Sequence, residues 1–163
     1  MLWRHAVLAL TLASGFMLAA AFGFEHLGGL PPCKLCWWQR YVFMAAAAVG
    51  IVAMALGRGT NGRVAAAGLG LLALTFTVGA GIAGYHVGVE LGWWRGPEGC
   101  AAASLSGDFN AMFRDLMNTP VVRCDEVPWS LFGISMAGYN VIVSLALAGF
   151  AVWAAHKRMN SNH

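Results

Sequence analysis

Two cysteines separated by two residues, Cys33 and Cys36, form the pattern with the clearest chemistry in the chain. Such a pair can close and open a small disulfide ring, and its reactive form is the thiolate. Pro31 and Pro32 come directly before the pair, and because proline fits poorly inside a helix we expect a helix to begin after Pro32. Cys36 then lies in or near the first turn, where the helix dipole favours a thiolate.

Three polar residues could assist this pair. Arg40 follows Cys36 by one helical turn on the same face, where its fixed charge favours the thiolate and its N–H groups can donate to the carbonyl of an electron acceptor. An arginine here could instead snorkel to the membrane interface, but beside Cys36 we favour a functional role. Gln39 is expected to point in a different direction from Cys36, in packing or in a supporting polar contact. His86 could hydrogen-bond a quinone, move protons, or lie at the interface without a role.

Two further cysteines, Cys100 and Cys124, lie far along the chain. Four cysteines allow three pairings, and the spacing does not choose among them. Cys33 and Cys36 could form half of a zinc site, but the second pair does not repeat the close spacing, so no metal is expected. Purely structural disulfides are the stronger alternative, although a short loop gains little from an internal Cys-x-x-Cys ring.

These residues must be positioned by membrane-spanning helices. The chain has 163 residues, of which 59% are hydrophobic and 10% charged, whereas soluble domains carry about 25% charged residues. Four apolar stretches, each near the roughly 20 residues that a crossing needs, cover about 6–24, 37–56, 64–85 and 131–155. Such spans must be helical because lipid offers backbone groups no partners. We therefore expect an all-α bundle of four transmembrane helices, forming a single membrane domain over 1–163. The net charge of +3 is scattered, which argues against nucleic-acid binding.

The distribution of charge predicts the orientation of the bundle. One side holds only basic residues (Arg4, Arg58, Arg63, Lys157 and Arg158), and the other holds all the acidic ones (Glu25, Glu90, Glu98, Asp108, Asp115, Asp125 and Glu126). Both termini are therefore expected in the cytoplasm. The loops over about 25–36 and 86–130, with all four cysteines in or beside them, are expected in the oxidising periplasm. The first stretch could be a cleaved signal peptide, but its run of about 19 apolar residues exceeds the usual 7–15.

Helical spacing also appears inside the second outer loop. Apolar residues recur between Asp108 and Met117, at Phe109, Met112, Phe113 and Leu116. This spacing predicts a short amphipathic helix, capped by Asp108, that lies on the membrane surface or packs on the rest of the loop. Within the spans, the glycines of 64–85 favour close helix packing, and Asn140 is a candidate for a polar contact between helices.

The combination of these features resembles the bacterial disulfide bond formation protein B (DsbB) family over nearly the whole chain. The features are the four spans, the motif Pro-Cys-x-x-Cys-x-x-Gln-Arg entering the second span, two further loop cysteines, and the segment 129–140 entering the fourth span. The resemblance implies an inner-membrane enzyme that recharges a periplasmic thioredoxin-fold oxidase (DsbA) and reduces ubiquinone or menaquinone. Some relatives carry glutamate where this chain has Gln39.

The resemblance also implies roles for the cysteines. The partner would attack the Cys100–Cys124 disulfide, with Cys100 taking the mixed disulfide. Cys124 would then exchange with Cys33, and Cys36 would pass electrons to the quinone beside Arg40.

Two alternatives stay open at this point. A vitamin K epoxide reductase-like enzyme also combines four spans with a Cys-x-x-Cys pair, but members of that family resemble one another in placing the pair near the last span. A membrane scaffold with structural disulfides is the non-enzymatic alternative. Quinone-dependent thiol oxidation separates an enzyme from a scaffold.

Overall fold

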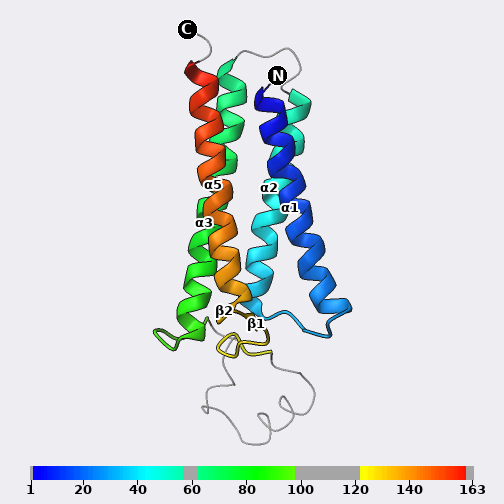
Figure 1. The fold of residues 1–163 in the computed structure, drawn as a ribbon, viewed down its shortest axis with the longest axis vertical. Helices are drawn as coiled ribbons and strands as arrows, with labels where there is room; N and C mark the ends of the chain where they lie inside the picture. The colour runs from blue at the N-terminus through cyan, green and yellow to red at the C-terminus, as the bar shows by residue number, and fades with distance from the viewer. Residues whose placement is uncertain (1, 57–61, 98–121, 161–163) are drawn as a thin grey trace, which may run out of the picture.

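Four long helices form the body of the molecule. The structure, a computed structural model, describes residues 2–56, 62–97 and 122–160. The helices are α1 (Leu2–His26), α2 (Lys34–Leu56), α3 (Gly62–Glu90) and α5 (Met136–Asn160), and a small antiparallel hairpin joins β1 (Ser130–Leu131) to β2 (Ile134–Ser135) (Figure 1). All four helices are long and apolar enough to cross a membrane. The expected all-α bundle of four membrane-spanning helices is confirmed.

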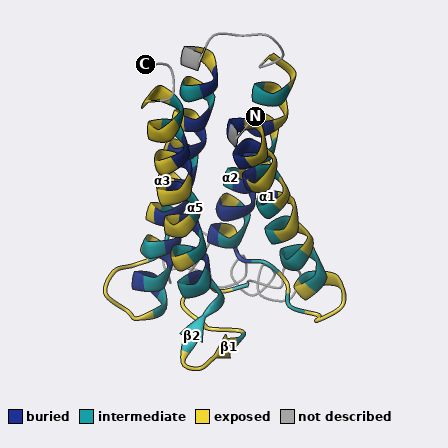
Figure 2. Cartoon of the chain, turned by 45° about the horizontal axis from the view of Figure 1, so that its top comes forward, coloured by how far each residue is buried: buried dark blue, intermediate teal, exposed yellow. Residues whose placement is uncertain are grey.

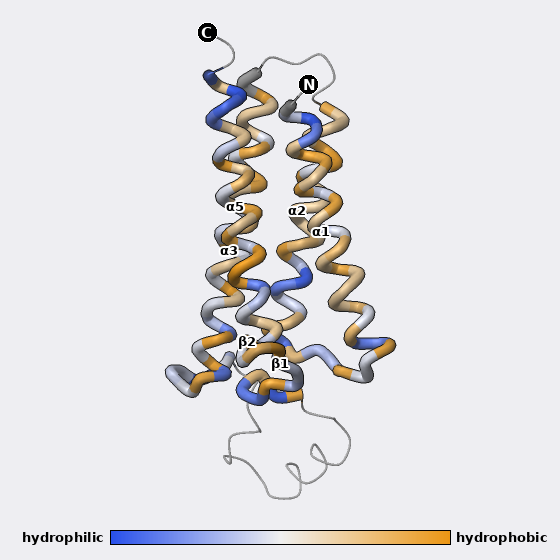
Figure 3. The backbone as a smooth tube through the Cα atoms, in the orientation of Figure 1, coloured by the Kyte–Doolittle hydropathy of each residue, from blue (hydrophilic) through white to orange (hydrophobic). Residues whose placement is uncertain are grey.

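Apolar residues cover the outside of the bundle as well as its interior. Large side chains such as Leu12, Phe16 and Leu74 are 60–72% exposed, and exposed residues run along the outer faces of the helices (Figure 2). Hydrophilic residues gather near the ends of the bundle (Figure 3). Water would not stabilise so much exposed apolar surface, but the hydrocarbon core of a membrane would. Inside, Val7, Leu10, Leu69, Leu72 and Phe76 are fully buried.

The two ends of the bundle hold different parts of the chain. The start of α1 and the end of α5 lie at one end, and the hairpin lies at the opposite end together with the turns that follow α1 and α3 (Figure 1). Helix α3 packs mainly against α5, and α2 packs against both α1 and α3. Gly79 permits the approach of α2 to α3, because a Cβ there would lie 2.9 Å from a methyl carbon of Val42. This confirms close packing through a small residue at that one position.

Helix α3 continues beyond the end expected at residue 85. It ends at Glu90 because Gly92 adopts a positive φ of 72°. The amide of Gly92 bonds to the carbonyl of Val89 (3.1 Å), and the amide of Trp93 bonds to that of Gly88 (2.9 Å). This is the pattern of a Schellman cap, which favours glycine at the left-handed position. The extra turn brings Glu90 to the same face as His86.

Helix α5 begins at Met136, five residues after the start expected from hydropathy. Phe132 and Gly133 both have positive φ, at 51° and 77°, and form the two-residue turn between β1 and β2. Ser135 then caps α5, since its hydroxyl oxygen accepts the amide hydrogen of Gly138 at 3.1 Å. The amphipathic helix expected at 108–117 lies outside the described residues.

Candidate functional site

The Cys-x-x-Cys pair sits at the start of α2, as the prolines before it predict. Cys33 caps the helix with its sulfur, which accepts the amide hydrogen of Cys36 at 3.2 Å. Both thiols are free, and their sulfur atoms lie 2.8 Å apart. The pKa of the Cys33 thiol is raised, mainly by its hydrogen bond with Cys36 and secondly by its burial. The shared proton therefore stays on Cys33, which leaves Cys36 as the better nucleophile.

Gln39 links the start of α2 to the helices beside it. Its Nε2 donates to the backbone oxygen of Leu35 (3.3 Å) and to Nδ1 of His86 (2.8 Å), while its Oε1 accepts from Nδ2 of Asn140. The backbone oxygen of Leu35 can only accept a hydrogen bond, so the atom of the Gln39 amide that faces it must be the nitrogen, Nε2. Nδ1 of His86 must then accept, so the neutral imidazole carries its proton on Nε2. Ser144 donates to Oδ1 of Asn140 at 3.1 Å and holds that amide in turn.

The protonated Nε2 of His86 faces the cysteines. It lies 3.7 Å from the sulfur of Cys33 and 3.9 Å from Oε1 of Glu90. The backbone of Cys124 also forms a hydrogen bond with the imidazole ring. The chain of side chains from Asn140 through Gln39 therefore orients one N–H donor toward the place where the thiols react.

Arg40 is buried in a cage of its own. Its NH1 donates to the carboxylate of Glu25, and NH2 donates to the backbone oxygen of Ala21 at 3.0 Å. The guanidinium carbon lies 4.7 Å from the centre of the Phe22 ring and 5.0 Å from that of Trp37. Because its side chain is only 7% exposed, Arg40 does not snorkel into water. Charge pairing and ring stacking hold it rigidly beside Cys36.

Cys124 lies against the Cys-x-x-Cys pair. It is fully buried and packs in one cluster with Cys33, Leu35 and Val89. Cys124 is engaged in a disulfide, whereas Cys33 and Cys36 are free. Cys100 lies outside the described residues. One sulfur of the second pair is thus buried beside the first pair, although 88 positions separate Cys36 from Cys124 in the chain.

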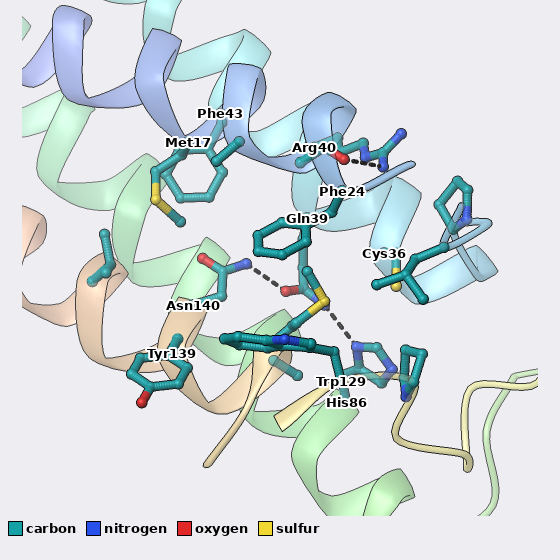
Figure 4. Close-up of a pocket in the computed structure, with 18 of the residues that line it drawn as sticks. Met17, Phe24, Cys36, Gln39, Arg40, Phe43, His86, Trp129, Tyr139 and Asn140 are labelled. Carbon is teal, nitrogen blue, oxygen red and sulfur yellow. Dashed lines mark hydrogen bonds between the residues drawn. The ribbon is translucent and has the colours of Figure 1, made fainter. Parts of the chain in front are cut away.

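A mainly apolar cavity of about 350 Å³ opens beside Cys36. The residues that line it come from all four long helices and from the segment around the hairpin, and Gln39 shares this wall with Cys36 instead of pointing away from it. A residue three positions along a helix stays on nearly the same side, which explains the difference from the sequence-based expectation. In Figure 4 the linked side chains of Asn140, Gln39 and His86 line the cavity, with Trp129 beside them. The lining includes Met17, Leu18, Phe24, Cys36, Gln39, Arg40, Phe43, His86, Glu90, Trp129, Tyr139 and Asn140.

The donor atoms near the cysteines do not suit a resident metal. The sulfurs of Cys33 and Cys36 and Nε2 of His86 lie within 4.8 Å of one another, close enough to surround an ion. A ligating nitrogen needs a free lone pair, but the amide of Gln39 leaves the proton of His86 on Nε2. We therefore treat the cluster as a redox site and not as a metal site.

Comparison with known proteins assigns the chain to a family. The sequence pattern of the family described as "Disulfide bond formation protein DsbB" matches residues 3–154. The chain belongs to the DsbB family. Among similar curated proteins, each named "Disulfide bond formation protein B", that of Herminiimonas arsenicoxydans is 38% identical over 92% of this chain and 87% of its own. That of Marinobacter nauticus is 33% identical over 86% and 83%, respectively. No solved structure gives a significant match.

DsbB membership makes the chain a multi-pass membrane protein of disulfide bond formation, with disulfide oxidoreductase chemistry. It also decides against the vitamin K epoxide reductase-like alternative. The structure brings Cys33, Cys36 and Cys124 together, with Arg40 and His86 around the same cavity.

Sequence reasoning missed two carboxylates of this DsbB-family site. The sequence predicts for Glu25 and Glu90 only a place on the outer side, yet Glu25 holds Arg40 and Glu90 faces His86. The available signal for Glu90 was its spacing of four residues from His86, which places the two on one helix face. No comparable signal relates Glu25 to Arg40, because they lie on different helices.

Proposed function

We propose that this chain oxidises protein thiols in the periplasm and passes the electrons to a membrane quinone. The observation that carries the proposal is the burial of Cys124 in one cluster with Cys33, directly beside an apolar cavity lined by Cys36 and Arg40. This arrangement supports a route from one cysteine pair to the other and then to an apolar oxidant. The partner would be a DsbA-like thioredoxin-fold oxidase, as membership of the DsbB family implies.

The quinone fits the residues of the cavity by size and by chemistry. Apolar side chains such as Phe24, Phe43 and Trp129 would hold the ring, and Arg40 would interact with its oxygens. When bound, a ubiquinone or menaquinone accepts two electrons and two protons. Cys36 would react as the thiolate, and the Cys33 thiol would keep its proton until the disulfide between the two closes. The N–H group at Nε2 of His86 would donate a hydrogen bond into the same space.

The cysteine route completes the proposal. A thiolate of the partner attacks the Cys100–Cys124 disulfide at Cys100, which releases Cys124 as a thiolate. Cys124 then attacks Cys33 of the oxidised Cys33–Cys36 pair, and Cys36 leaves as a thiolate that faces the cavity. The second thiol of the partner displaces Cys100 and completes the partner's disulfide. Cys100 then attacks Cys124, which restores the Cys100–Cys124 disulfide and releases Cys33 as a thiol beside the Cys36 thiolate. Each exchange forms one S–S bond and breaks one, so no external oxidant is needed until the quinone takes the electrons.

Quinone reduction by the purified protein tests this function. With a small dithiol as reductant, the wild type is expected to reduce a short-chain quinone with one dithiol consumed per quinone. Cys36→Ser is expected to lose the reaction, because no thiolate then faces the cavity. The measurement is the change in quinone absorbance, with dithiol consumption followed in parallel. A wild-type rate equal to that of Cys36→Ser would favour the scaffold alternative.

The proposed orientation has both termini in the cytoplasm and the cysteines at the periplasmic end. In a cysteine-free background, we expect a membrane-impermeant thiol reagent to label Phe132→Cys in intact spheroplasts but not Asn160→Cys. Phe132 is 90% exposed at the hairpin, and Asn160 is exposed at the end of α5 on the other side of the bundle. Labelling both after permeabilisation is the control. The opposite pattern in intact spheroplasts would reverse the orientation.

A further inference from the structure

Glu90 is a buried carboxylate in the same cavity for which the proposed chemistry has given no role. Its side chain is 5% exposed, and it lines the cavity with Cys36 and His86. Oε2 accepts a hydrogen bond from the hydroxyl of Ser135, which in turn accepts from the amide of Gly138 at the start of α5. Oε1 is left facing Nε2 of His86 at 3.9 Å. A proton on this carboxyl would therefore reside on Oε1, toward the cavity.

Proton balance requires such a group. Oxidation of the Cys33 thiol and the Cys36 thiolate to a disulfide releases two electrons and one proton. Reduction of a quinone to a quinol takes up two electrons and two protons, so one further proton must be supplied inside the cavity. This count rests on the proposed function and on Cys36 reacting as the thiolate.

His86 cannot supply that proton by itself. Gln39 occupies Nδ1, so a neutral His86 that gave up its Nε2 proton would become an imidazolate anion. A carboxylic acid loses a proton far more readily. The carboxylate that remains on Glu90 would be stabilised by the Ser135 hydroxyl and by the N-terminus of α5.

We propose that Glu90 is the proton donor of the quinone cavity: it carries a proton on Oε1 and releases it, with the proton of Cys33, as the disulfide closes. Titratable and charged groups from α3 itself and from the other elements lie around the cavity with Glu90. Helix α3 contributes His86, and α2 contributes Cys36 and Arg40, with Cys33 directly before it. Helix α5 contributes Tyr139. Glu25 of α1 pairs with Arg40, and the α1 residues that line the cavity are apolar. Among the described residues of this lining, Glu90 is the carboxyl available to donate.

Single-turnover reduction of a short-chain quinone by the pre-reduced protein tests the proposal. Glu90→Gln keeps the acceptor for Ser135 but has no acidic proton, and the rate at neutral pH is expected to fall about 100-fold, the lower end of the usual contribution of a general acid. The rate of this variant should rise as the pH is lowered, because water-borne protons then replace the missing one. Glu90→Asp should recover part of the rate. Glu126→Gln, at an exposed carboxylate outside the cavity, is the matched control.

An infrared difference spectrum of the quinone-free protein, reduced minus oxidised, gives a readout that does not depend on turnover. We expect a signal of a protonated side-chain carboxyl in the wild type and in Glu126→Gln, and its loss in Glu90→Gln. If Glu90→Gln kept the wild-type rate and pH profile, or kept the carboxyl signal, the role of Glu90 would be overturned and the proposed function would stand. Failure of the wild type to reduce quinone would overturn this role together with the proposed function.

Discussion

Replacing Arg40 with alanine is expected to lower the turnover of quinone reduction by about 100- to 1,000-fold, the usual effect of losing one preorganised donor aimed at developing charge. Arg40 lines the cavity that contains Cys36, and it is held there by Glu25, Ala21 and two aromatic rings. In the proposed reaction, a cation held in this way would stabilise negative charge on the quinone oxygens without having to reorganise. Lysine should substitute incompletely, because an ammonium lacks the planar set of donors.

The measurement is steady-state quinone reduction with a small dithiol, normalised to folded protein. The loss of Arg40 also leaves Glu25 without its partner, and an unpaired partly buried carboxylate could by itself disturb the site. The double variant Arg40→Ala/Glu25→Gln separates the two effects. If Arg40 acts on the quinone, the double variant stays as slow as Arg40→Ala. Recovery of turnover in the double variant would limit Arg40 to neutralising Glu25.

Replacing Cys100 with serine is expected to stop oxidation of the DsbA-like partner while leaving dithiol-driven quinone reduction intact. Cys124 is fully buried and Cys33 is 4% exposed, so neither sulfur is open to a thiolate on a soluble protein. In the proposed route a thiolate of the partner enters through Cys100, whereas a small dithiol can reach the half-buried Cys36 and reduce the Cys33–Cys36 pair directly.

Two assays on the same preparation check this prediction. The first follows formation of the partner's disulfide, and the second follows quinone reduction with dithiol. Arg40→Ala is the matched comparison, because it should slow the second reaction and leave thiol exchange between the partner and the Cys100–Cys124 disulfide in place. Partner oxidation at the wild-type rate by Cys100→Ser would show that electrons enter elsewhere.

The sequence was sufficient for the features that depend on local composition. Long apolar runs determine membrane-spanning helices, because lipid leaves no other way to satisfy the backbone. The prolines before Cys33 determine where α2 begins, and helical spacing alone places Cys36 and Arg40 one turn apart. Hydropathy was a poorer guide to helix ends. The Gly92 cap lets α3 run on to Glu90, and the turn at Phe132 and Gly133 delays α5, because backbone conformation and hydrogen bonding end a helix and hydropathy does not.

Only the tertiary structure decided what the polar side chains contact. Asn140 is suggested by its sequence position as a contact between helices, but not as the group that orients Gln39, 101 positions away, and through it the proton of His86. Likewise, the pairing of Arg40 with Glu25 and the burial of Cys124 beside Cys33 join different helices and loops. A periodic pattern reports which face of one helix a residue occupies. It carries no information on how neighbouring helices are rotated about their axes, and that rotation, set by packing of the whole bundle, determines which side chains meet.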